Sequence, residues 1–229
     1  MVASQPPTKS KPMKNITIIG ASAGLGLETV VKSLADGHHV TSLSRSIENL
    51  PQHPNLTIVQ GSATKGSDVQ RAVAGANAII VTIGTGTKID WQTISKGTTL
   101  YTDAATVLLG VLTKLKMQVP LVVVTGFGAG NSKNYLPFFL NVLISLPLHK
   151  IYANKTHMEE LLSSNYKNWV IVRPGVLTDK PAKGHYRMYN QLGNDVEGGD
   201  IARADVANFL VSQAVNPTEI GHYVVLMGN

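Results

Sequence analysis

The chain has 229 residues, 43% of them hydrophobic, and carries a formal net charge of +6 with a sequence pI of about 9.5. This length and apolar content allow one well-buried domain, and the absence of cysteine excludes disulfides, thiolate metal ligands and a cysteine nucleophile. The lysines and arginines are scattered and form no basic stripe interleaved with aromatic residues, so the charge favours a small anionic ligand over nucleic acid.

Residues 1–13 are polar, contain proline and lysine, and lack the apolar core of a signal peptide. We expect them to form a disordered leader, followed by a single domain over residues 14–229. No segment reaches the ~20 apolar residues of a membrane span, and we therefore expect a cytoplasmic protein. No spacing of His, Asp and Glu is typical of a metal site, and we expect no metal.

Near the N-terminus, a short β-branched apolar run at residues 16–19 opens through glycines into a helical pattern. A strand that turns into a helix in this way directs backbone N–H groups and the positive helix end at one spot, which suits a pyrophosphate. Gly20 permits the tight turn, Gly24 lets a diphosphate approach the backbone, and Gly26 lets the helix pack close to the strand. The residues expected to contact a dinucleotide here are Gly20, Ser22, Ala23, Gly24, Leu25 and Gly26.

Apolar runs alternate with longer helical patterns along the rest of the chain. This alternation predicts an α/β fold, a doubly wound parallel sheet (a Rossmann fold) with helices on both faces. Strands are expected over residues 16–19, 39–44, 56–60, 78–83, 121–125, 169–172, about 185–188 and 221–226. Helices are expected over residues 25–36, about 68–74, 101–116, 152–163 and 205–215. Ligands of such sheets lie beyond the carboxyl ends of the strands.

Four motifs occur in a fixed order along the chain. They are the glycine turn of the form Gly-x-x-x-Gly-x-Gly, Ala-Val-Ala-Gly-Ala-Asn-Ala-Ile-Ile at residues 72–80, Trp-Val-Ile-Val-Arg-Pro-Gly at residues 169–175, and Ala-Arg-Ala-Asp-Val-Ala at residues 202–207. Together they resemble the atypical branch of the short-chain dehydrogenase/reductase superfamily over about residues 14 to 228. Size and layout are most similar to the biliverdin-IXβ reductase/flavin reductase-like proteins of that branch.

The end of the second expected strand distinguishes NAD from NADP, because an acidic residue there accepts hydrogen bonds from the ribose and repels a 2′-phosphate. This strand ends in Ser44, Arg45 and Ser46, and the first carboxylate is Glu48. The Arg45 guanidinium offers a planar fork to a phosphate, and the serines offer hydroxyls. We therefore expect NADPH as the cofactor, the alternative being that Arg45 is an ordinary exposed arginine.

The ends of the other strands supply the remaining expected cofactor contacts. In the resembled family the third strand usually ends in an aspartate near the adenine, whereas this chain has Gly61, Ser62 and Ala63. Contact there must use the backbone or the Ser62 hydroxyl. The cofactor contacts expected beyond the second strand are Ser62, Ala63, Ile83, Gly84, Thr85, Thr125, Lys155, Pro174, Gly175 and Val176.

The resemblance implies a catalytic serine, tyrosine and lysine, the last two usually four residues apart on one helix face. Here the candidate lysine is Lys155, the tyrosine is Tyr152, only three residues earlier, and the serine position falls near Thr125. Tyr152 is either catalytic or a packing residue, and Lys155 either contacts the cofactor ribose or is solvated. No complete triad is matched. Flavins and linear tetrapyrroles can take their proton from solvent, which fits this pattern better than carbonyl reduction does.

An apolar segment at residues 136–148 lies where a substrate lid is expected, and a subunit interface or plain core are the alternatives. Expected substrate contacts are Phe127, Phe138 and His185. We predict an NADPH-dependent oxidoreductase that transfers hydride to a planar conjugated acceptor, a flavin or tetrapyrrole first and a quinone or enone next. The rivals are a non-catalytic NADP(H) sensor that binds protein partners, and a carbonyl reductase or epimerase using Tyr152 and Lys155. We expect a monomer or weak homo-oligomer acting on a small planar apolar substrate.

Overall fold

The computed structural model describes residues 12–84, 96–136, 148–193, 196 and 198–229. Residues 1–11 of the expected leader lie outside this part of the chain. Thr85, Phe138 and residues 137–147 of the apolar segment also lie outside it, so the expectations for them are carried no further.

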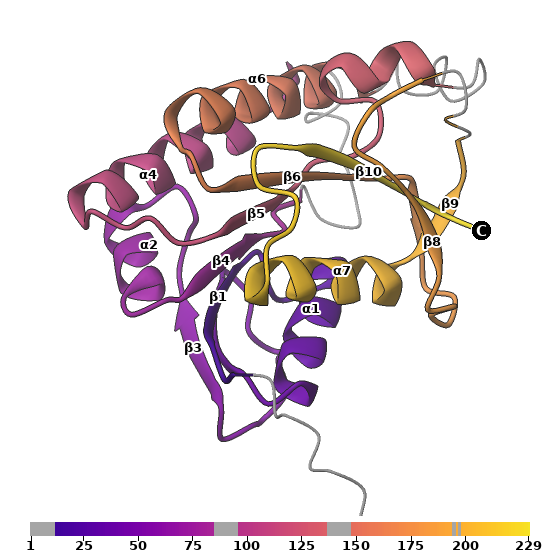
Figure 1. The fold of residues 1–229 in the computed structure, drawn as a ribbon. Coiled ribbons are helices and arrows are strands. Elements are labelled where there is room, and N and C mark those ends of the chain that lie inside the picture. Colours follow the sequence, from indigo (N-terminus) through magenta and orange to yellow (C-terminus); the bar gives the residue numbers. More distant parts are fainter. Residues whose placement is uncertain (1–11, 85–95, 137–147, 194–195, 197) are drawn as a thin grey trace, which may run out of the picture.

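An eight-stranded sheet forms the centre of the molecule (Figure 1). Its strand order is β3-β2-β1-β4-β5-β6-β10-β8, and every neighbouring pair is parallel except the edge strand β8, which is antiparallel to β10. The strands are β1 (Asn15–Ile19), β2 (His39–Ser44), β3 (Leu56–Gln60), β4 (Ala78–Val81), β5 (Leu121–Val124), β6 (Trp169–Pro174), β8 (Tyr186–Tyr189) and β10 (Tyr223–Gly228). The strand order reverses between β1 and β4, where ligands of such sheets bind.

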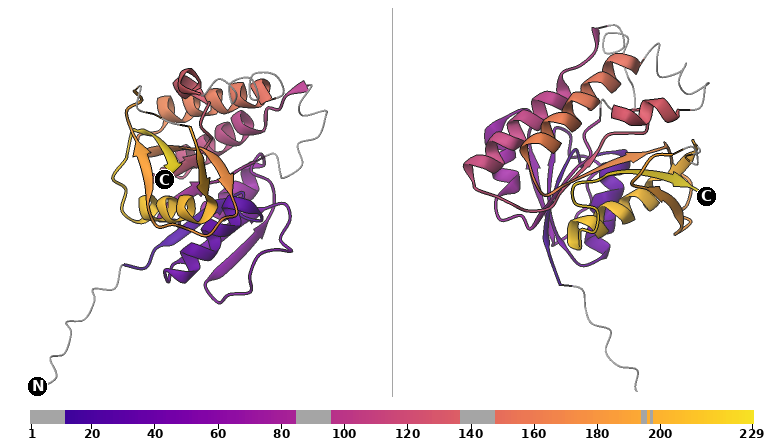
Figure 2. Two further views of the ribbon diagram at one scale, coloured as in Figure 1. Left: turned by 90° about the vertical axis from the view of Figure 1, so that its right-hand side faces the viewer. Right: turned by 45° about the horizontal axis from the view of Figure 1, so that its top comes forward.

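Helices cover both faces of the sheet (Figures 1 and 2). On one face lie α1 (Gly24–Ala35) and α7 (Arg203–Val215), side by side. On the other lie α2 (Gly66–Val73), α4 (Leu100–Lys114) and α6 (His149–Asn165). A 3₁₀ helix, η1 (Gly130–Tyr135), follows β5. This arrangement confirms the predicted doubly wound α/β fold.

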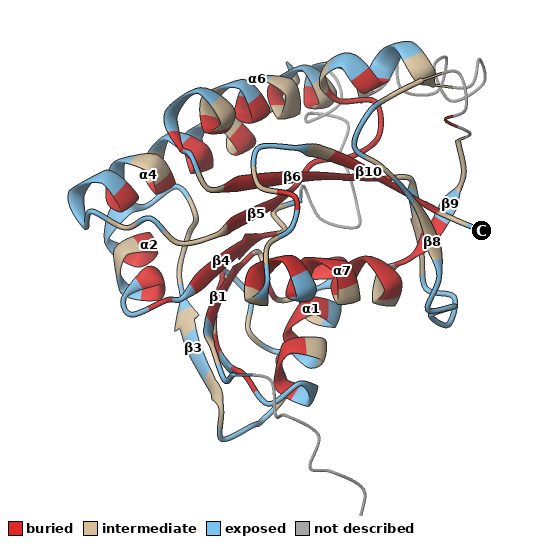
Figure 3. Ribbon diagram, viewed as in Figure 1, coloured by how far each residue is buried: buried red, intermediate tan, exposed pale blue. Residues whose placement is uncertain are grey.

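The central strands are buried on both faces, as parallel sheets between two helix layers require (Figure 3). Alternate residues of β4 illustrate this: Ala78 and Ile80 pack with α1 and α7, whereas Ile79 and Val81 pack with the opposite helices. In the described part of the chain, no helix combines the length and apolarity of a membrane span.

A second, two-stranded sheet was not anticipated from the sequence. It pairs β7 (Val176–Thr178) with β9 (Asp200–Ala202) in parallel. Each strand has only three residues, too few for an alternating pattern to be read from the sequence. The sheet links the chain after β6 to the start of α7, and both points lie at the carboxyl edge of the main sheet.

Candidate cofactor and active site

The turn between β1 and α1 closes tightly against the neighbouring strands. Gly20 has a φ of +91°, and a β-carbon there would lie 2.9 Å from the backbone nitrogen of Ile83. A β-carbon on Gly26, in the first turn of α1, would overlap the Gly20 carbonyl oxygen. Neither position has room for a side chain, as the predicted roles of these two glycines, a tight turn and close helix packing, require.

The start of α1 is open to an anionic group. Its N-cap residue, Ala23, makes no side-chain cap, and its first turn has no acidic residue. The first N–H groups of a helix lack partners within the helix, so they remain available to a ligand. Gly24 has a φ of +50° and carries no side chain over this opening. The turn thus fits the diphosphate of a dinucleotide cofactor.

At the end of β2, Ser44 and Arg45 take different positions. Ser44 is buried, and its Oγ accepts a hydrogen bond from the N–H of Ala21 at 2.9 Å, which fastens the glycine turn to β2. Arg45 is exposed, and its carbonyl oxygen accepts a bond from Gln60 Nε2 at 3.1 Å. The backbone of Arg45 is therefore fixed while its guanidinium is free to meet a phosphate at this edge.

The end of β3 meets an aspartate that the sequence pattern did not reveal. Asp68, on α2, accepts a hydrogen bond from the N–H of Ser62 at 3.0 Å, and this bond holds the pKa of the carboxyl below its usual range. The Ser62 hydroxyl pairs with Thr64 Oγ1 at 2.9 Å. Ala63 and Ile83 line a small apolar pocket, whose other lining residues are Ile19, Val81, Ala104, Ala105, Leu108 and Met158.

Tyr152 and Lys155, both on α6, meet at the carboxyl end of β5. A β-carbon on Gly126 would lie 3.3 Å from Tyr152 Oη and 3.6 Å from Lys155 Nζ. The ammonium lies 4.9 Å from the centre of the Tyr152 ring, and it donates a hydrogen bond to the Thr125 carbonyl oxygen at 2.7 Å. The three-residue spacing therefore still brings both polar atoms to one point.

Burial shifts both of these groups away from their ordinary pKa values. Desolvation lowers the pKa of Lys155 to about 8, and the Glu159 carboxylate opposes this shift. Desolvation raises the pKa of the Tyr152 phenol. Near neutral pH the phenol is therefore protonated and Lys155 is mainly charged, so both act as hydrogen-bond donors.

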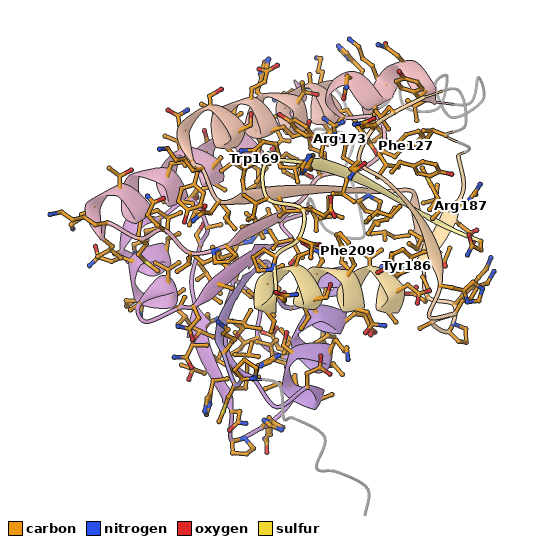
Figure 4. The ribbon with its side chains drawn as sticks, viewed as in Figure 1. Phe127, Trp169, Arg173, Tyr186, Arg187 and Phe209 are labelled. Atoms are coloured by element: carbon orange, nitrogen blue, oxygen red, sulfur yellow. The ribbon has the colours of Figure 1, made fainter. Side chains whose placement is uncertain are left out.

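A buried ion pair lies within hydrogen-bond distance of the Thr125 hydroxyl, and one of its members, Arg173, is labelled in Figure 4. Arg173, on β6, donates to Glu159 of α6 through Nη2 at 2.7 Å and Nε at 2.9 Å, and both side chains are almost fully buried. Its Nη1 donates to Asn131 Oδ1 at 2.7 Å. The Thr125 hydroxyl donates to Glu159 Oε1 at 2.6 Å. The only proton of the candidate catalytic hydroxyl is therefore directed at the ion pair.

The remaining predicted residues lie at the same edge of the sheet but in different surroundings. Phe127 is buried against Val196, Val225 and Met227, and its side chain is part of the packing (Figure 4). His185 is exposed beside the edge strand β8, where its Nδ1 lies 2.8 Å from the Lys183 carbonyl oxygen.

The turn after β6 is held by backbone bonds. Pro174 accepts one from the N–H of Phe127 at 2.9 Å, and the N–H of Gly175 donates to Leu226 at 2.9 Å. Val176 is 53% exposed at this edge. Of the three cofactor contacts predicted here, Pro174, Gly175 and Val176, only Val176 has a largely exposed side chain.

Comparison with known proteins identifies the family. A family model described as NAD(P)H-binding matches residues 20–217. The chain belongs to this NAD(P)H-binding family. The matched range runs from the glycine turn to just past the end of α7, and it includes the carboxyl ends of β2, β3, β4, β5 and β6.

Two relatives of the NAD(P)H-binding domain differ in how much they share with it. Over 76 residues it is 40% identical to a 3β-hydroxysteroid dehydrogenase of Mycolicibacterium neoaurum, a match to 33% of this chain and only 21% of that enzyme's length. Over 208 residues it is 28% identical to an uncharacterised chloroplastic protein of Arabidopsis thaliana, covering 86% of this chain and 71% of that protein.

Solved structures share the fold. ChuY, an anaerobilin reductase of Escherichia coli O157:H7, matches with a TM-score of 0.71 at 22% identity, covering 93% of this chain and 96% of ChuY. A short-chain dehydrogenase/reductase of Veillonella parvula, solved with NADP, matches with a TM-score of 0.75 at 18% identity, covering 93% of this chain and 94% of that one. A proposed NADH-flavin reductase of Streptococcus pneumoniae matches with a TM-score of 0.72 at 18% identity, covering 94% of this chain and 100% of that one. The family model confirms the predicted NAD(P)H binding, and these neighbours confirm the predicted Rossmann-type fold.

Proposed function

We propose that this protein uses NADPH to reduce a planar conjugated acceptor, a flavin or a linear tetrapyrrole. The observation that carries the proposal is the Thr125 hydroxyl, which donates to Glu159 at 2.6 Å in a buried setting. In carbonyl reduction by the serine, tyrosine and lysine set that the resemblance implies, the hydroxyl at the serine position donates to the substrate oxygen beside the tyrosine, and Thr125 has no free proton to give it. An acceptor that takes its proton from solvent has no such need. The named activities of ChuY and the streptococcal neighbour support the same acceptor classes.

Different residues would bind different parts of the cofactor. Gly24 and the first turn of α1 hold the diphosphate, Arg45 holds the 2′-phosphate, and Lys155 donates to the nicotinamide ribose. When bound, NADPH supplies the hydride. The protein's contribution is to fix the cofactor and exclude water between it and the acceptor, since positioning alone supplies much of the rate of such a transfer.

The first test is NADPH oxidation at about 340 nm, the nicotinamide absorption band, with FMN, FAD, biliverdin, a quinone and a small ketone as separate acceptors. Turnover of the flavin or the tetrapyrrole, with none of the ketone, is the expected result. Turnover of the ketone alone would overturn the proposal. Tight NADPH binding without turnover of any acceptor would replace it with a non-catalytic NADP(H) sensor.

A second candidate, a carbonyl reductase or epimerase, is favoured by the convergence of Tyr152 Oη and Lys155 Nζ beside Gly126. Substitution of Tyr152 by phenylalanine separates the two functions. We expect kcat with the flavin or tetrapyrrole to stay within about threefold of wild type, because no side-chain acid is needed there. A loss of about a hundredfold or more, the usual contribution of a general acid, would instead assign the proton to Tyr152. Phenylalanine keeps the ring over the Lys155 ammonium, so a loss of turnover would report the hydroxyl alone.

Arg45→Ala tests the choice of cofactor. We expect the Kd of NADPH to rise about tenfold to a hundredfold while that of NADH changes less than about threefold, because only NADPH carries the 2′-phosphate. Arg45→Lys is the matched control. We expect its Kd for NADPH to lie between those of wild type and Arg45→Ala, since lysine keeps the charge but loses the planar donor fork. Titration of nicotinamide fluorescence measures both constants. Equal losses for the two dinucleotides would refute the assignment of Arg45.

A further inference from the structure

Arg203, the first residue of α7, lies against the glycine turn. If Gly24 carried a β-carbon, its nearest neighbours outside the turn would be Arg203 Nε at 3.5 Å and Cδ at 4.0 Å. The two helices pack side by side and both begin at the carboxyl edge of the sheet (Figure 1), which brings an arginine from the far end of the chain over the first turn of α1. The sequence motif around Arg203 gave no sign of this contact.

The present partner of Arg203 is a carboxylate that solvent reaches easily. Arg203 Nη1 donates to Asp179 Oδ1 at 2.7 Å, and the side chains are 23% and 89% exposed, respectively. Exposed carboxylates contribute little to such a pair, so Asp179 orients the guanidinium at small cost and can be exchanged for another anion. By contrast, Asp205 of the same motif accepts the N–H groups of Lys183 and Gly184, and so fixes a loop.

We propose that Arg203 binds the diphosphate of the cofactor, which replaces the exposed carboxylate of Asp179 as the partner of the guanidinium. The inference rests on the proposed dinucleotide function. The glycine turn provides backbone N–H groups and the positive end of α1, and Arg203 adds a full charge and a planar donor fork on the side where Gly24 lacks a side chain. Arg45 and Arg203 then recognise different phosphates of one cofactor.

The two arginines predict opposite patterns of binding, measured by calorimetry on the full chain without turnover. Arg203→Met is expected to weaken NADPH and NADH by the same factor, about tenfold to a hundredfold, because both carry the diphosphate. It should leave the Kd of adenosine 2′-monophosphate within about twofold, since that probe lacks the diphosphate. Arg45→Ala should weaken NADPH and adenosine 2′-monophosphate and spare NADH.

Three controls separate binding from structure. Asp179→Asn removes the ion pair but keeps Arg203, and we expect its NADPH affinity to equal or exceed that of wild type by up to about threefold. Lys32→Met breaks the Lys32–Asp36 pair at the other end of α1 and should leave every Kd unchanged. Arg203→Lys keeps the charge and most of the aliphatic stem, and we expect its affinity for both dinucleotides to fall about threefold to tenfold. This variant replaces Arg203→Met in the test if the methionine variant does not fold.

The outcomes are distinct. Wild-type protein that binds neither dinucleotide would overturn the proposed function together with this inference. Wild-type binding with an unaffected Arg203→Met variant would overturn the inference alone. A loss in Asp179→Asn equal to that in Arg203→Met would also overturn it, because the ion pair would then act only in the structure.

Discussion

Replacing Gly26 by alanine is expected to weaken NADPH binding by about a hundredfold and to lower the free energy of unfolding by about 1–3 kcal/mol. A β-carbon at this position overlaps the Gly20 carbonyl oxygen and also meets Thr82 Oγ1 at 2.8 Å. The start of α1 must therefore move away from β1, and the N–H groups that face the diphosphate move with it. Calorimetric titration with NADPH measures the first effect, and urea unfolding of the ligand-free protein measures the second.

Gly110→Ala is the matched control. Gly110 lies inside α4, and a β-carbon there meets nothing within 4 Å. We expect this variant to bind NADPH as wild type does and to gain about 0.5–1 kcal/mol of stability, because alanine is the better helix former. A Gly26→Ala variant with unchanged NADPH affinity would show that the turn tolerates the displacement, and the role given to this glycine would be wrong.

Glu159→Gln is expected to lower the free energy of unfolding by about 3–5 kcal/mol, because it leaves the buried Arg173 guanidinium without a counter-charge. Both side chains are only 2% exposed, so water cannot replace the lost carboxylate. The double variant Glu159→Met/Arg173→Met should recover much of this loss, since apolar residues of similar size often replace a buried ion pair at little cost. Urea unfolding of the single and double variants gives both values.

The surface pair Lys180–Asp200 provides the comparison. Its side chains are 68% and 48% exposed, and we expect Lys180→Met to change the free energy of unfolding by less than about 1 kcal/mol. If Glu159→Gln cost no more than Lys180→Met, the ion pair behind Thr125 would not stabilise the turn after β5. The Thr125 proton would then have no fixed acceptor, contrary to the proposed function.

Local patterns were sufficient to predict most of the fold. The apolar runs gave β2 and β3 with the observed bounds, and the glycines gave the turn into α1, because both signals depend on neighbouring residues only. The helix α6 begins earlier than expected, at His149, and β7 and β9 were missed because three-residue strands carry no periodicity.

The candidate site was predicted less completely, because its contacts join distant segments. Arg203 reaches Gly24 only because α7 packs beside α1, and Glu159 meets Arg173 only because α6 covers β6. Asp68 comes to the end of β3 from α2. None of these pairs has a spacing that a sequence pattern encodes. Tyr152 and Lys155 could be paired from the sequence because one helix carries both.

The buried ion pair also constrains how this chain can change over generations. Gly130 has a φ of +53°, and a β-carbon there would overlap the Arg173 guanidinium. Substitution of Gly130, Glu159 or Arg173 alone therefore meets either a clash or an uncompensated charge. Mutational paths through these three positions must be concerted, so that the acceptability of one residue depends on the other two. We therefore expect these three buried residues of the candidate site to be substituted together, while the exposed residues around them vary independently.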